Sequence, residues 1–120
     1  MNNIQPELKR LHSPDLLNLD NPKLDRERPF CILVQAMFGP IGSPGEEAFD
    51  VLVCNPKWIE QRSREGMFTG RHHLIVEEFD ANRIRLFLAA LAEHCAAPTW
   101  AEVAEKLGRI GKWEFEDFVT

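Results

Sequence analysis

The stretch from Arg71 to Cys95, RHHLIVEEFDANRIRLFLAALAEHC, constrains the fold of this chain more than any other. Its first part, His72 to Phe79, is apolar and β-branched at its centre and is bounded by Gly70 and Asp80, which is typical of a strand. Its second part repeats apolar residues at helical spacing, at Ile84, Phe87, Leu88, Leu91 and Cys95. A strand that leads directly into the longest helix predicts a two-layer core on which the other elements pack.

Both predicted helices of the second half carry capping signals. Asp80 can accept hydrogen bonds from the free amides of a first helical turn, so it is predicted as the N-cap of the longer helix. Thr99 and Glu102 have the spacing of a capping box, which predicts a second helix after the closing segment Ala96-Ala97-Pro98. The apolar stripe of this second helix consists of Trp100, Val103, Ala104 and Leu107.

A hairpin is predicted before these elements. The segment Pro29–Phe38 is mostly apolar at both alternating positions, which predicts a central strand covered on at least part of both faces. Glu46–Cys54 is predicted as the next strand, and the short turn GPIGSPG between them favours antiparallel pairing. Asn55 and Pro56 then suit the N-cap and first position of a short helix.

The remaining segments complete the predicted architecture. Glu7–His12 is predicted as a short edge strand and Lys112–Val119 as the last strand. In the loop Ser63–Thr69, Met67 and Phe68 are expected to pack against apolar neighbours. The order of elements predicts an α+β fold, an antiparallel sheet with two main helices packed on one face plus a short helix.

Length and composition limit the function classes. The 120 residues are predicted to form a single domain, 1–120, with 44% hydrophobic and 28% charged residues. No apolar run could span a bilayer, and no secretory signal is visible at the start, so a cytoplasmic protein is expected. The net charge of −5 argues against direct nucleic-acid binding. Cys31, Cys54 and Cys95 lack metal-ligand spacing and are expected to be buried reduced thiols.

Catalytic chemistry has weak support in the sequence. His72 and His73 are adjacent on a predicted strand and should point to opposite faces, so both cannot ligate one ion. No GxSxG elbow and no cofactor motif occurs, so no catalytic, cofactor-binding or metal residue is assigned. A small hydrolase that uses a metal, or one of these histidines with Cys54 or Cys95, stays open as the alternative function.

Acidic side chains suggest a surface for a partner. The candidate carboxylates are Glu77, Glu78, Asp80, Glu114, Glu116 and Asp117. If the strands that carry them pair, they would share one patch, with Trp58 and Trp113 as aromatic anchors. Such a patch suits a tight interface with a basic protein. The alternative is a solvated sheet edge with both tryptophans in the core.

The chain resembles the immunity protein 8 family of bacterial polymorphic toxin systems from about Pro6 to the C-terminus. The segments that carry the resemblance are Ser13-Pro14-Asp15, the strand Phe30–Phe38 with Gly39 and Ile41-Gly42, Phe49–Val53 followed by Asn-Pro-Lys-Trp-Ile, Gly70-Arg71-His72 before Leu74–Phe79, Trp100–Leu107, and Trp113–Glu116. No single segment is catalytic or diagnostic, and the resemblance rests on the order and spacing of all of them together. The resemblance implies a cytoplasmic protein that binds and neutralises a cognate toxin domain and has no catalysis of its own.

Overall fold

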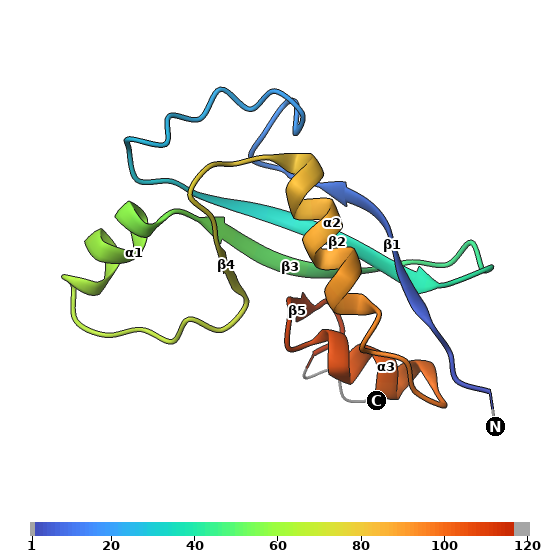
Figure 1. Cartoon of the computed structure of the whole chain (residues 1–120). Coiled ribbons are helices and arrows are strands. Elements are labelled where there is room, and N and C mark those ends of the chain that lie inside the picture. The colour runs from blue at the N-terminus through green and yellow to red at the C-terminus, as the bar shows by residue number, and fades with distance from the viewer. Residues whose placement is uncertain (1, 117–120) are drawn as a thin grey trace.

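The computed structural model describes residues 2–116 as an α+β fold, which confirms the predicted class (Figure 1). The elements in chain order are β1 Pro6–His12, β2 Cys31–Pro40, β3 Glu47–Cys54, α1 Pro56–Ser63, β4 His73–Ile75, α2 Ala81–Ala92, α3 Trp100–Leu107 and β5 Lys112–Trp113. The edge strand, the hairpin and all three helices thus form where the sequence predicts them. Asn55, Asp80 and Thr99 are the three N-caps, and each side chain accepts a hydrogen bond from the amide three residues later.

The strands form one largely antiparallel sheet in the order β1-β2-β3-β4. The β1–β2 and β2–β3 pairs are antiparallel, which places β2 inside the sheet as predicted. The other edge of β3 is shared by two short strands. At one end, Leu52–Cys54 pair in parallel with β4, and at the other end Phe49 and Asp50 pair antiparallel with β5.

Helices α2 and α3 cover the same face of the sheet (Figure 1). Alternate residues of β2 and β3 point to this face and are buried: Val34, Ala36, Phe38, Phe49, Val51 and Val53. They form one cluster with Ile84 and Leu88 of α2 and with Val103 and Leu107 of α3. The placement of both main helices on one face is therefore as the sequence predicts.

Two predicted strands are shorter than expected. Instead of His72–Phe79, β4 spans His73–Ile75, and it lies at the edge of the sheet. The reason is that its partner β3 ends at Cys54, where the chain turns into α1. Instead of Lys112–Val119, β5 ends at Trp113 and a turn follows, in which the Glu116 N–H donates to the Trp113 carbonyl at 2.9 Å. Residues 117–119 of the predicted strand lie outside the described residues.

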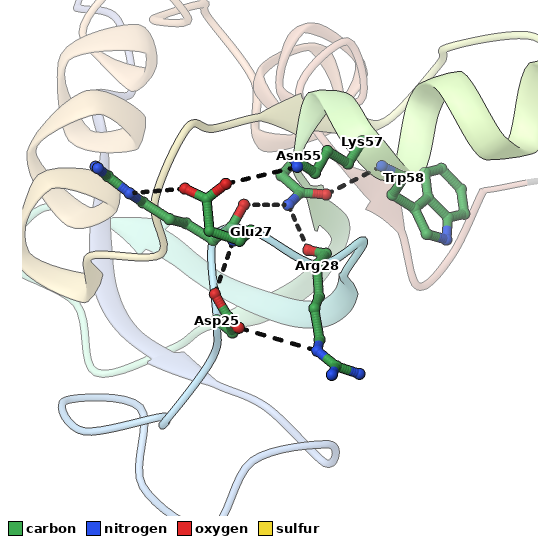
Figure 2. A network of polar contacts seen from close by, with 7 residues as sticks. Asp25, Glu27, Arg28, Asn55, Lys57 and Trp58 are labelled. Atoms are coloured by element: carbon green, nitrogen blue, oxygen red, sulfur yellow. Dashed lines mark hydrogen bonds and ion pairs between the residues drawn. The ribbon is translucent and has the colours of Figure 1, made fainter.

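Asn55 joins β3 to α1 and holds the loop before β2 (Figure 2). Its side chain is 1% exposed. Its Oδ1 accepts from the Phe30 and Trp58 N–H groups, both at 3.0 Å, and its Nδ2 donates to the Arg28 carbonyl at 2.7 Å and to the Arg26 carbonyl at 3.4 Å. All four hydrogen-bonding positions of the amide are thus used.

Of the two residues of the loop after α1 that are expected to pack against apolar neighbours, Phe68 does so and Met67 does not. Phe68 packs edge-on against Trp58 with ring centroids 6.0 Å apart, as expected of an apolar loop residue. Met67 was expected to be covered as well, but it is 97% exposed. The rings of Phe68 and His73 pack against Trp58 of α1 and against each other, and no described segment lies over Met67.

Candidate partner-binding surface

Glu77 and Glu78 follow β4 and are exposed. Neither side chain makes a hydrogen bond or an ion pair with any residue between 2 and 116. Asp80 lies beside them, but its carboxylate accepts from the Arg83 N–H at 3.1 Å as the N-cap of α2. The two glutamates are therefore available to an outside partner, while Asp80 also has a role in its own helix.

Glu114 and Glu116 follow β5 and are both engaged within the fold. The Glu114 carboxylate accepts from the Ala48 N–H, and the Glu114 N–H donates to the Ala48 carbonyl at 3.0 Å. Glu116 forms an ion pair with Arg71 at 3.2 Å. Asp117, the third predicted carboxylate of this group, lies outside the described residues.

The two acidic groups lie at opposite ends of β3 and do not form one patch. Val76, just before Glu77, donates its N–H to the Cys54 carbonyl, while Glu114 is bonded to Ala48. Cys54 and Ala48 stand six residues apart on one strand, so they are separated by about 20 Å. The prediction of a shared patch required β4 and β5 to pair with each other, and instead both pair with the same edge of β3.

Trp113 packs on the core. Its ring stacks on Phe49 at a centroid distance of 6.4 Å, and its Nε1 donates to Oε1 of Glu47 at 3.0 Å. The same oxygen accepts from Trp100 Nε1 at 2.5 Å. Glu47 thereby connects α3 and β5 to the start of β3.

Trp58 belongs to a separate aromatic cluster beside α1. Its ring stacks on His73 at 5.7 Å and meets Phe68 edge-on, and the guanidinium of Arg62 lies 5.6 Å from the centre of the Phe68 ring. Trp58 is half-buried within this cluster.

Helix α2 exposes apolar side chains that the helical pattern assigned to the core. Phe87 is 51% exposed and Leu91 is 36% exposed, whereas Ile84 and Leu88 are buried as predicted. Leu86 is also exposed. The segment LFLAALA, 86–92, is apolar on every side of the helix, which is more than one sheet face can cover. That feature of the sequence is the signal that could have indicated an exposed apolar surface.

Two open hollows lie along α2 and meet at Leu74 and Phe87. One, of about 370 Å³, extends toward α3 and is bounded there by Lys106 and Arg109. The other, of about 340 Å³, extends toward the carboxylates of Glu77, Glu78 and Asp80 and also contains Arg83. Together they form one groove, the α2–β4 groove, which is apolar in the middle and acidic at one end.

Of the groups proposed for catalysis, His73 and Cys95 line the same open hollow, together with His94, whereas His72 and Cys54 do not line it. His72 has a left-handed backbone, with φ of 65°, and its Nε2–H donates to the Gly108 carbonyl at 2.7 Å, while His73 lies in the aromatic cluster of Trp58. Within residues 2–116, no three His, Cys, Asp or Glu side chains are grouped as metal ligands. Burial raises the pKa of the Cys54 thiol to about 11 and also raises the pKa of Cys95, so both thiols are poor nucleophiles at neutral pH.

No helix among the described residues has the length and apolar character needed to cross a membrane.

Comparison with known proteins places the chain in a family. No curated protein and no solved structure matches the chain significantly. The family model for immunity protein 8, Imm8, matches residues 6–118, which is nearly the whole chain and includes both strands of the hairpin, α2 and α3. The chain belongs to the immunity protein 8 family.

Proposed function

We propose that this protein is a cytoplasmic inhibitor that binds a cognate toxin domain and neutralises it by covering its active surface. The observation that carries the proposal is the family match over residues 6–118, since that family is one of immunity proteins. In this proposal the chain acts as a single domain. It catalyses no reaction and does not contact nucleic acid directly.

The exposed carboxylates support a basic toxin surface as the target. Glu77 and Glu78 are exposed and unpaired within the described part of the chain, and the protein carries a net charge of −5. An acidic surface attracts a basic partner over distances of about 10 Å and accelerates association. Asp80, Glu114, Glu116, Asp117, Trp58 and Trp113 stay predictions as further partner contacts.

Inhibition by occlusion predicts stoichiometric neutralisation. The cognate toxin domain, sought first among the genes next to the gene for this chain, is titrated with purified protein while the toxin activity is followed. We expect activity to fall linearly and to reach its minimum at a fixed molar ratio, with a stable complex on size exclusion. Complete loss of toxin activity at a small fraction of that ratio would instead require turnover by this chain and would contradict the proposal. Absence of any complex would contradict it as well.

A further inference from the structure

One edge of β4 has no neighbouring strand among the described residues. In the parallel pair with β3, the Leu52 N–H donates to the His72 carbonyl at 2.9 Å and the Val76 N–H donates to the Cys54 carbonyl at 2.8 Å. Because successive residues of a strand direct their backbone groups to opposite sides, the N–H and C=O of Ile75 point away from β3. These two groups find no partner within residues 2–116, so this edge is open to another strand.

The open edge lies beside the α2–β4 groove. Ile75 lines the same hollow as Ile84 and Phe87 of α2. Leu74 pairs with the buried Val53, so it faces the helix side of the sheet and forms part of the groove floor. A strand added to β4 would therefore direct every second side chain into the groove.

Charge distinguishes the two ends of this groove. The end next to Asp80 holds three carboxylates and the guanidinium of Arg83, which leaves a net charge of minus two. The opposite end holds Lys106 and Arg109, of which Lys106 donates to the Ala96 carbonyl at 3.0 Å. An occupant that matches this pattern has a basic side chain at one end, apolar side chains in the middle and an acidic group at the other end.

We propose that the toxin adds an extended segment as a strand to the free edge of β4. Its apolar side chains pack on Leu74 and Phe87, its basic side chain lies against Glu77 and Glu78, and its acidic group faces Arg109. This inference rests on the proposed function, because the toxin is the partner. A helix laid on α2 would use the exposed apolar side chains but would leave the Ile75 backbone unpaired, so the open edge favours a strand.

Substitutions at Ile75 separate backbone pairing from side-chain contact. Ile75→Pro removes an N–H that β3 does not use, and its ring obstructs an incoming strand, whereas Ile75→Thr keeps that N–H and the β-branched shape. With an inactive variant of the cognate toxin domain, we expect Ile75→Pro to raise Kd at least about tenfold and Ile75→Thr to change it by less than about threefold. Phe87→Ser should raise Kd about tenfold or more. Equal affinity of the proline and threonine variants would overturn the inference.

Hydrogen exchange of the unmodified protein tests the same contact without any substitution. The Ile75 amide should exchange at least about tenfold more slowly in the complex, because it becomes hydrogen-bonded to the added strand. Unchanged exchange at Ile75 would overturn the inference even if the proline variant fails to fold. An effect of Phe87→Ser without protection at Ile75 would show that the toxin covers the groove without adding a strand. Failure of the unmodified protein to bind the toxin would instead contradict the proposed function itself.

Discussion

The indole Nε1 of Trp113 donates to Oε1 of Glu47 at 3.0 Å, and this bond ties β5 to the first residue of β3. Trp100 at the start of α3 donates to the same oxygen at 2.5 Å. One carboxylate therefore holds both α3 and β5 at the start of β3, in addition to the pairing of β5 with β3 and the hydrogen bonds between Glu114 and Ala48. Gly111 allows this close approach, since a Cβ there would lie 2.9 Å from Cγ2 of Val51.

Glu47→Ala should lower the free energy of unfolding by about 2–3 kcal/mol, because two hydrogen bonds to a charged acceptor are lost and both half-buried indoles lose their partner. Urea unfolding followed by tryptophan fluorescence measures the change. Glu46→Ala is the matched control, since Glu46 makes an ion pair with Arg10 near solvent and its removal should cost at most about 1 kcal/mol. Equal costs for the two variants would contradict the role given to Glu47.

Asn55→Ala should cost about 3 kcal/mol of stability. The substitution removes the N-cap of α1 and leaves the Phe30 N–H and the Arg28 carbonyl without their buried partner. Thermal unfolding followed by circular dichroism provides the measurement. In the control Asn18→Ala, the lost contact to the Asp20 N–H is exposed, and the expected cost is below about 0.5 kcal/mol. A loss below about 1 kcal/mol for Asn55→Ala would show that the network contributes little.

Raising the pH should destabilise the protein through Cys54. Burial raises the pKa of this thiol from 9.0 to about 11, so between these values the folded protein keeps a proton that the unfolded chain releases. Stability is therefore full below pH 9 and falls as the pH rises toward 11, by on the order of 2 kcal/mol. In urea unfolding with reductant present, the free energy of unfolding of Cys54→Ala should fall less between pH 9 and pH 11 than that of the unmodified protein. If the free energy of unfolding fell equally steeply with pH in both proteins, Cys54 would not be the cause of the loss.

Charge reversal at Glu77 and Glu78 should slow association with a basic toxin. We expect the double variant Glu77→Lys/Glu78→Lys to associate about tenfold more slowly at low salt and to lose much of the salt dependence of the rate. Stopped-flow mixing with the inactive toxin domain measures both. Glu60→Lys/Glu65→Lys on α1 and the loop after it makes the same formal change on another surface and should stay within about twofold of the unmodified protein. Similar rates for the two double variants would argue against steering by Glu77 and Glu78.

The local elements of this fold could be predicted well from the sequence. Asn55, Asp80 and Thr99 act as N-caps where their side chains precede helical patterns, because capping depends on residues three positions away. The hairpin of β2 and β3 follows from two apolar strands and a short glycine-rich turn. The family resemblance, which depends on the order of such segments, is confirmed by the match over residues 6–118.

The arrangement of the candidate surface could not be predicted in the same way. Whether β4 and β5 pair with each other or with β3 depends on contacts between residues that lie far apart in the chain. The helical pattern grouped Phe87 and Leu91 with Ile84 and Leu88, although only the latter two are buried, and Phe87 and Leu91 line the open groove instead. Periodicity shows which side of a helix is apolar, but it does not show how much of that side a neighbouring element covers.

The sequence by itself thus determined the caps, the hairpin, the positions of the helices and the family, because each depends on short-range patterns of polarity and backbone preference. Only the tertiary structure decided that the acidic groups lie at opposite ends of β3 and that Glu47 joins two tryptophans. It also decided that, among residues 2–116, no strand lies on the outer edge of β4, beside exposed apolar side chains. The physical reason is that strand pairing and burial are properties of surfaces brought together by the whole chain.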